Sequence, residues 1–417
     1  MKDVLGRGEL LPVKEAEEML LSLPFAPTGT EIVSLENAYG RILCEDIFSR
    51  EELPGFDRST MDGYAVRSSD TFGATETTPQ YLKIRGEVLM GKVPEFEILP
   101  GEAAKIPTGG MLPAGADSVI MLEDTNMVSP TLVEVFSAVG PGENIIRRDE
   151  DLKRGELILK KGSKLRPQDV AALGGMGITR IPVFKKPVVT LISTGDEILP
   201  SDKPIQLGKV RDVNSHNLYG LVLEHGGIPV RAGILRDDFE LIRDTVLKAI
   251  DASEVVLITG GSSAGTRDYI ERVLESIEGS KILFHGVSIK PGKPLLVSVV
   301  EDRKIVYGLP GHPAAVSVSF LRFVRPVLRR FTGEVTPDVK EHSRRIRAFL
   351  SENISSLSGR EDNVRVRLHR EDGRFIATPV LGKSGLIMTL VRADGLIRIP
   401  PEKTGLYEGE EVVVELF

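Results

Sequence analysis

Cysteine is almost absent from this sequence of 417 residues, and tryptophan is absent altogether. The single cysteine, Cys44, excludes an intramolecular disulfide and a cysteine-based metal site. The six histidines show no metal-ligand spacing, such as a pair four residues apart on a helix. Because aromatic residues make up only 5% of the chain, ring-stacking platforms for single-stranded nucleic acid are not expected.

Long apolar runs and an excess of positive charge are also missing. No run approaches the length of a membrane span, and the first eleven residues lack the apolar core of a signal peptide. The net charge of −7 argues against a general nucleic-acid binder, which would carry a basic face. With 41% hydrophobic and 27% charged residues, the composition is typical of a soluble globular protein, and we expect a cytoplasmic location.

The residue pattern changes several times along the chain. A helical pattern in residues 12–23 gives way to short β-type runs separated by Gly, Pro and Thr. Alternating strand and helix patterns follow, and the chain ends in period-two alternation around Asp372-Gly373, a strong hairpin signal. We therefore expect four domains: residues 1–54 with 140–187 as one discontinuous domain, 55–139 as an inserted β-rich domain, 188–332 as an α/β domain, and 333–417 as a small antiparallel β domain.

Polar loops follow three apolar β-type runs of the α/β domain. They are residues 194–197, 259–268 and 308–313. In an open parallel sheet, such loops line one crevice at the carboxyl ends of the strands. Glycine amides beside carboxylates suit a phosphorylated ligand and a divalent cation, so we expect a phosphate-bearing small molecule there.

The second loop is rich in glycine and serine. The run from Gly260 to Gly265 could cradle an anion, or it could be a plain turn between strand and helix.

Acidic residues lie near the ends of several expected elements of the same domain. A subset of these acids would hold Mg²⁺, which prefers oxygen ligands. Helices expected to begin at Asn214 and Asp237 also offer N-capping as an explanation for the Asx residues there. The acids are Asp196, Glu197, Asp237, Asp238 and Asp268.

Two stiff turns complete the local candidates. Lys290 and Lys293 alternate with prolines and a glycine, which favours a rigid cationic clamp for an oxyanion over a solvated turn. Pro313 suits the first turn of a helix and would leave backbone amides pointing outward. His312, just before it, is expected to be a hydrogen-bonded structural histidine.

Together these motifs make the sequence similar, over essentially its whole length, to the molybdopterin molybdenumtransferase family, which completes assembly of the molybdenum cofactor. The resemblance implies a multidomain α/β fold. A three-layer α/β domain resembling molybdopterin adenylyltransferases would be joined by a discontinuous N-terminal domain, an inserted β-rich domain and a C-terminal β barrel. The motifs that carry it are residues 54–65, 106–109, 142–148, 193–197, 260–268, 289–294 and 309–313.

The resemblance also implies a homodimer whose active site joins the α/β domain of one subunit to the inserted domain of the other. This gives a role to Asp62 and Thr108, which lie in loops that show no local sign of catalysis. The implied substrates are molybdate and adenylylated molybdopterin, the latter supplied by a molybdopterin adenylyltransferase as upstream partner. Mg²⁺-dependent cleavage of the pyrophosphate link would release AMP.

The candidate residues follow from these motif positions. Glu197, Asp237 and Asp268 are the implied Mg²⁺ ligands, and Lys293, Ser384 and Thr389 are assigned to molybdate or the pterin. The candidate catalytic residues are Asp62, Thr108, Glu197, Asp237, Asp268 and Lys290. The candidate substrate-binding residues are Gly260, Gly261, Ser262, Ser263, Gly265, Lys293, Pro310, Gly311, Pro313, Ser384 and Thr389.

Some positions depart from the family pattern. Ser262 stands where Val is commoner, His312 where Asn is common, and Ala315 where Ser is frequent. Gly286 replaces a lysine that some members carry. These departures concern oxyanion binding rather than the class of reaction.

Three alternative functions remain open. An adenylyltransferase-like enzyme would share the α/β domain, but it would not need the other domains or the motif of residues 61–66. A non-enzymatic scaffold would be expected to bring a long linker or a fused module, and the sequence contains neither. A tungstate-inserting variant is equally compatible, since tungstate and molybdate have the same charge and nearly the same shape.

Overall fold

A computed structural model describes residues 10–260, 264–335 and 345–417, with the side chains of residues 264–268 excepted. The chain divides into two compact units. The first comprises the chain up to Glu45, Lys161–Pro167 and the chain from Arg180 onward; the second comprises Asp46–Lys160 and Gln168–Thr179. None of the helices in the described ranges is long and apolar enough to cross a membrane.

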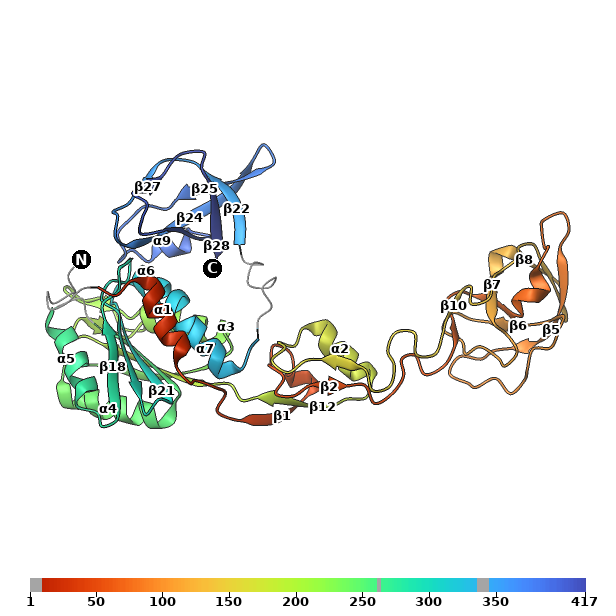
Figure 1. Cartoon of the computed structure of the whole chain (residues 1–417), viewed down its shortest axis with the longest axis horizontal. Coiled ribbons are helices and arrows are strands. Elements are labelled where there is room, and N and C mark those ends of the chain that lie inside the picture. Colours follow the sequence, from red (N-terminus) through yellow and green to blue (C-terminus); the bar gives the residue numbers. More distant parts are fainter. Residues whose placement is uncertain (1–9, 261–263, 336–344) are drawn as a thin grey trace. The chain divides into compact units, whose positions relative to one another are not determined.

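A six-stranded sheet forms the centre of the α/β part of the first unit (Figure 1). Its first four strands are parallel, and the last two are antiparallel to their neighbours. In spatial order the strands are β16 (Ile228–Leu235), β13 (Val188–Thr194), β17 (Val255–Thr259), β21 (Lys304–Leu309), β20 (Leu296–Val300) and β18 (Ser280–His285).

Helices cover both faces of this sheet. Along β13, Val189 and Leu191 face one hydrophobic core and Ile192 faces the other, because successive side chains of a strand point to opposite faces. The first core contains α1 (Val13–Ser22), α3 (Asn214–Glu224), α6 (Pro313–Ser319) and α7 (Arg325–Thr332), and the second contains α4 (Phe239–Ala252) and α5 (Ala264–Glu275). The expected three-layer domain is therefore confirmed.

The last helix of the α/β domain is not regular throughout. A π-helical turn, η4 (Phe320–Val324), joins α6 to α7. One helix start differs from its expected form. Asp238 caps α4 as expected, whereas Asn214 does not cap α3, where Asp212 accepts the backbone N–H of Ser215 at 3.0 Å.

The C-terminal part of the first unit is a closed five-stranded barrel. Its ring runs β24-β25-β22-β28-β26 and closes through β24 and β26. The predicted hairpin is present, with Asp372 and Gly373 at φ 48° and 78° between β24 and β25. The strands are β22 (Arg345–Leu350), β24 (Glu361–Glu371), β25 (Arg374–Pro379), β26 (Gly395–Ile399) and β28 (Glu411–Leu416).

Smaller elements surround the barrel and the sheet. Most important for the site is β19 (Ile289–Lys290), which pairs in parallel with the start of β24. Further small elements of the first unit are β14 (Ile198–Leu199) paired with β15 (Val210–Arg211), β23 (Ile354–Ser355) paired with β27 (Gly405–Leu406), and the helical turns η1 (Leu35–Asn37) and α9 (Met388–Val391).

The N-terminal region is discontinuous, as expected. β1 (Thr30–Ser34) pairs with β12 (Arg180–Phe184) in the first unit, and β2 (Ile47–Phe48) pairs with β11 (Leu157–Leu159) in the second. Each pair joins a segment that precedes the inserted domain to one that follows it. The helix α2 (Pro167–Gly175) lies between β11 and β12 in the chain.

The inserted domain is rich in β-structure, also as expected. A six-stranded sheet in the order β7-β4-β6-β5-β9-β8 forms its core, with β3 (Arg58–Ser59) and β10 (Ile145–Ile146) paired beside it and two 3-10 turns, η2 (Ser68–Thr71) and η3 (Leu122–Asp124). The sheet strands are β4 (Gly63–Val66), β5 (Gln80–Glu87), β6 (Glu102–Ile106), β7 (Ser118–Met121), β8 (Thr125–Ser129) and β9 (Leu132–Val135).

Candidate active site

A cavity of about 540 Å³, which we call the strand-end cavity, lies at the carboxyl ends of β13, β17 and β21. All three loops that follow these strands contribute to its wall, so the predicted convergence of the loops is confirmed. Its lining residues include Ser193, Thr194, Glu197, Asp212, Asn214, Thr259, Gly260, Gly311, His312 and Pro313. Gly261, Ser262 and Ser263 lie outside the described residues, and Gly265 and Asp268 belong to α5 without described side chains.

The main chain at Gly195 allows the carboxylate of Glu197 to fold back against it. Gly195 has a φ of 145°, and a Cβ at this position would lie 2.7 Å from Oε2 of Glu197. Any other residue would therefore push the carboxylate away or strain the turn. Glycine at this position thus leaves room for the carboxylate of Glu197 at the wall of the strand-end cavity.

Asp212 is a second carboxylate at the same wall, and sequence reasoning missed it. It is 8% exposed, its Oδ2 accepts the hydroxyl of Ser193 at 2.8 Å, and its Oδ1 accepts the N–H of Ser215. The signal that could have identified it is an acid placed shortly before a helix and after a two-residue strand. These bonds tie the beginning of α3 to the end of β13.

The candidate acids Asp196, Asp237 and Asp238 make hydrogen bonds near the beginning of α4. Oδ1 of Asp196 accepts the backbone N–H of Asp237 at 3.4 Å, and Asp238 accepts the N–H of Leu241 at 2.9 Å. Among the described residues there is no group of three His, Cys, Asp or Glu side chains close enough to hold a metal ion. The candidate ligand set includes Asp268, whose side chain is outside the description.

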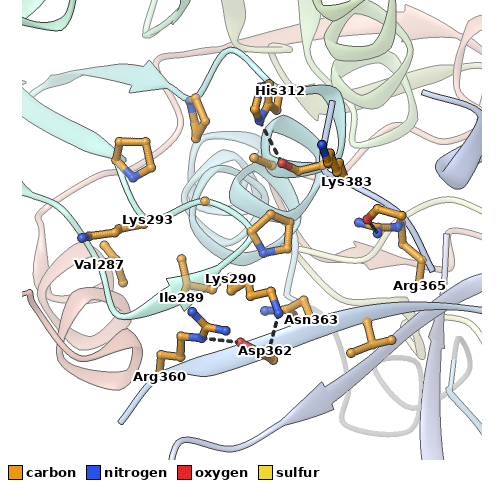
Figure 2. Close-up of a pocket in the computed structure, with 18 of the residues that line it drawn as sticks. Val287, Ile289, Lys290, Lys293, His312, Arg360, Asp362, Asn363, Arg365 and Lys383 are labelled. Carbon is orange, nitrogen blue, oxygen red and sulfur yellow. Dashed lines mark hydrogen bonds and ion pairs between the residues drawn. The ribbon is translucent and has the colours of Figure 1, made fainter. Parts of the chain in front are cut away.

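A second cavity, of about 440 Å³, lies between the α/β part and the barrel, and we call it the cationic cavity (Figure 2). Lys290, at the end of β19, and Lys293, in the turn after it, line one wall, and residues of β24 and the segment after β25 line another. Gly311 and His312 line both cavities. Further charged and polar lining residues are Arg360, Asp362, Asn363, Arg365, Lys383 and Ser384.

One buried carboxylate organises two of these cations. Asp362, with a side chain only 3% exposed, accepts Lys290 Nζ at 3.2 Å and Arg360 Nε at 2.9 Å (Figure 2). The pairing follows from the register of β19 and β24, which places Lys290 beside Asp362. Lys290 nevertheless remains 55% exposed, so its ammonium group can also reach a ligand.

Arg365 is the most deeply buried cation of this cavity. It is 8% exposed, and burial lowers the pKa of its guanidinium. Its Nη2 donates to the carbonyl of Gly382 at 2.8 Å, while its Nε has no hydrogen-bond partner among the described residues. With Lys290, Lys293, Arg360 and Lys383 nearby, the cavity carries more positive than negative charge, which suits an oxyanion.

The corner between the cavities is held by hydrogen bonds. His312 Nδ1 lies 2.8 Å from Ser384 Oγ, and the N–H of Ala314 donates to the carbonyl of Ser384 at 3.1 Å. Pro313 begins α6, as expected. Pro310 lines the cationic cavity. Thr389, by contrast, lines neither cavity; it is 6% exposed and donates its hydroxyl to Leu386.

The two candidates in the inserted domain contact each other. Oδ1 of Asp62 accepts the backbone N–H of Thr108 at 2.7 Å and its hydroxyl at 3.0 Å. The backbone N–H of Thr108, and then its hydroxyl, hold the pKa of Asp62 below its usual value. Both residues are exposed, so the Asp62 carboxylate and the Thr108 hydroxyl are accessible to another molecule.

Family models match three parts of the chain. They describe the MoeA N-terminal region with domains I and II (residues 11–177), a probable molybdopterin binding domain (residues 190–330) and the MoeA C-terminal region with domain IV (residues 347–417). Together with the α/β domain, the barrel and the two cavities, these matches define a protein of molybdenum-cofactor biosynthesis.

Similar proteins sharpen this assignment. Molybdopterin molybdenumtransferases from Nostoc sp. and Bacillus subtilis are 34% and 33% identical to this chain. The first match covers 92% of this chain and 88% of the relative, and the second 99% and 95%. A crystal structure of the molybdopterin biosynthesis MoeA protein from Pyrococcus horikoshii is 36% identical, with a TM-score of 0.84, and covers 98% of this chain and 100% of that one. The chain belongs to the molybdopterin molybdenumtransferase family.

Proposed function

We propose that this chain inserts molybdate into adenylylated molybdopterin and releases AMP. The observation that carries the proposal is the meeting of two chemically different cavities at Gly311 and His312. The strand-end cavity has strand ends and carboxylates, as a phosphate-bearing ligand with a cation requires. The cationic cavity has an excess of cations, as an oxyanion requires. Such neighbours would hold the two substrates side by side.

The reaction requires the protein mainly to position charged groups. Cleavage between two phosphates depends on alignment and on neutralising the oxygens that gain charge. Lys290 and Lys293 would neutralise oxyanions, with Ser384 beside them. Gly260 and the glycine- and serine-rich run after it would cradle phosphate through backbone N–H groups. Thr389 would act only indirectly, through the segment that carries Ser384.

In chemical type, the carboxylates of the candidate ligand set suit a hard divalent cation. Glu197 at the cavity wall and the acids Asp237 and Asp268 offer oxygen ligands of the kind that Mg²⁺ prefers. When bound, Mg²⁺ would neutralise charge on the pyrophosphate. The role of Glu197 is to supply a carboxylate for which the turn at Gly195 leaves room.

The proposal includes a homodimer with a shared active site. The Asp62 carboxylate and Thr108 are hydrogen-bonded and exposed, and Met61 and Met90 are exposed in the same unit. Another protein surface could cover this arrangement. Asp62 and Thr108 would complete the site of the partner subunit. We further propose that the enzyme acts in the cytoplasm, downstream of a molybdopterin adenylyltransferase.

The decisive experiment measures AMP release from adenylylated molybdopterin with Mg²⁺, with and without molybdate. Molybdate-dependent release supports the proposal, and its absence contradicts it. Consumption of ATP with free molybdopterin would instead favour the adenylyltransferase alternative. Replacing molybdate by tungstate in the same assay compares the two oxyanions.

Mixed dimers test the shared site. Asp62→Ala and Lys290→Ala subunits should each be inactive as homodimers, whereas the mixed dimer should regain part of the activity, because one of its two sites is then intact. No regain in a dimer of verified composition would contradict the sharing of the site.

A further inference from the structure

An arginine lies in the π-helical turn η4 that joins α6 to α7. Arg322 is the one polar residue of this turn; its four neighbours are buried, and its own side chain is 12% exposed. Turns of this kind are rare and are frequently found at functional sites. An unpaired charge in such surroundings would be costly, so the position of Arg322 depends on its partners.

Arg322 binds two carboxylates from different parts of the first unit. Its Nη1 lies 2.8 Å from Oε1 of Glu17 on α1, and its Nη2 lies 3.0 Å from Oε2 of Glu361, the first residue of β24. Glu361 is as buried as the arginine, and its Oε1 accepts Nδ2 of Asn363 at 3.1 Å. One guanidinium thus joins the helices to the start of the barrel strand that lines the cationic cavity.

The start of β24 carries the carboxylate that organises this cavity. In the parallel register of β19 and β24, Ile289 lies beside Glu361 and Lys290 lies beside Asp362. Asp362 in turn holds Lys290 and Arg360 (Figure 2). A shift of Glu361 would therefore also move the neighbouring carboxylate and the two cations that it holds.

The helix that carries Arg322 also lies against the lysine turn. Ala315 lines the cationic cavity, and a Cβ at Gly292, between the two lysines, would lie 3.0 Å from Oγ of Ser319. Ala315, Ser319 and Arg322 are spaced four and three residues apart, as neighbours on one side of a helix are. This side of α6 and η4 thus meets the lysine turn at one end and Glu361 at the other.

We propose that Arg322 is a positioning residue of the cationic cavity, acting through Glu361 on Asp362. By holding Glu361 it fixes the start of β24, so that Asp362 keeps Lys290 in its orientation. The contact of Arg322 with Glu17 fastens α1 and is not part of this path. That the oriented lysine serves an oxyanion rests on the proposed function, whereas the orientation itself does not.

The two arms of Arg322 are tested separately, in the full-length protein, with variants of unchanged size. Glu361→Gln removes the charge on the arm toward the cavity, and Glu17→Gln removes it on the arm toward α1. The guanidinium keeps one carboxylate in each case, and both variants should lose stability in denaturant unfolding. Glu361→Gln alone should raise the KM for molybdate in molybdate-dependent AMP release, by about fivefold, with kcat little changed.

Glu361→Asp keeps the charge but is one methylene shorter, so its KM should lie between those of wild type and Glu361→Gln. This variant maintains the test if the glutamine variant does not fold. An equal rise in KM in Glu17→Gln would overturn the proposal, because the effect would then follow stability rather than the path through β24. A wild-type KM in every folded Glu361 variant would overturn it as well.

A second measurement needs no substrate. Lys290 is 55% exposed, so its amine can be acetylated by acetic anhydride and the rate followed by mass spectrometry, with the exposed Lys281 on β18 as the internal reference. Because an amine released from its carboxylate is more reactive, acetylation of Lys290 should be about threefold faster in Glu361→Gln. Asp362→Asn should show the same increase, and Glu17→Gln should not.

The two measurements separate this inference from the proposed function. Faster acetylation of Lys290 in Glu361→Gln, without molybdate-dependent AMP release by wild type, would overturn the proposed function alone. Wild-type acetylation in Glu361→Gln would overturn the positioning role of Arg322, whatever the activity.

Discussion

The strand-end cavity and the cationic cavity share Gly311 and His312, but they are built in different ways. The first is formed by the ends of three neighbouring parallel strands, so main-chain geometry fixes most of its wall. The second is formed by long cationic side chains that come from β19, β24 and the segment after β25. The difference implies that the first cavity depends on turns and the second on ion pairs.

The largest effect is expected when the cationic cavity loses a cation that can reach the ligand. Lys290→Ala should lower molybdenum insertion about 1000-fold, because a positioned charge that stabilises an oxyanion is lost. The fold should persist, since Lys290 is half exposed. Molybdopterin-bound molybdenum is the measured product, and Lys281→Ala, an exposed lysine on β18, is the control. Wild-type insertion by Lys290→Ala would exclude this lysine from the mechanism.

In the strand-end cavity, a comparable test removes the charge of Glu197 and leaves the turn at Gly195 intact. Glu197→Gln should lower AMP release about 100-fold and move the Mg²⁺ dependence to higher concentration, because an amide is a weaker ligand than a carboxylate. AMP release is titrated with Mg²⁺, and the exposed Glu240→Gln serves as the control. An unchanged Mg²⁺ titration would remove Glu197 from the candidate metal ligands.

The two modes of construction also explain which features the sequence could predict. The loops after β13, β17 and β21 and the hairpin at Asp372-Gly373 follow from local patterns, since strand ends and turn residues are encoded within a few positions. Lys290 and Asp362, in contrast, are 72 residues apart. Only the pairing of β19 with β24 brings them together, and no local pattern encodes that register.

Arg365 and Asp212 were missed for related reasons. Arg365 lies in a strand with period-two alternation, where an arginine would ordinarily face solvent, yet the barrel turns it into the cationic cavity. For α3, sequence reasoning considered Asn214 as the cap, whereas the carboxylate two positions earlier makes the capping bond. Asn214 instead donates its side-chain amide to the carbonyl of Gly311 at 2.8 Å, a contact made across the fold.

A smaller effect is expected for the carboxylate that orders the cations of the second cavity. Asp362→Asn keeps the shape but removes the charge that binds both Lys290 and Arg360. We expect the KM for molybdate to rise about tenfold, as is common when a residue that orients a ligand-binding group is lost. Asp372→Asn in the hairpin of the same barrel is the control. If the KM for molybdate stays at the wild-type value, the cavity does not depend on this ion pair.

The smallest effect on activity is expected for the ion pairs that fasten the barrel to α7, because their residues line neither cavity. Burial opposes ionisation of Glu415 on β28, but the guanidinium groups of Arg398 and Arg325 outweigh it and hold its pKa below the usual value of 4.5. Arg325 lies 2.6 Å away at the start of α7.

Since the pKa of Glu415 is lower in the folded state than in the unfolded chain, its stabilisation is present above pH 4.5 and is lost as the pH falls through the folded-state value. Glu415→Gln should therefore lower the free energy of unfolding by about 2 kcal/mol at pH 7, and this difference from wild type should shrink under acid conditions. Denaturant unfolding at both pH values measures it. Glu411→Gln, which breaks an exposed ion pair with Arg347 on the same strand, should cost no more than about 0.5 kcal/mol. Equal losses in the two variants would mean that the Glu415 pairs do not hold the barrel in place.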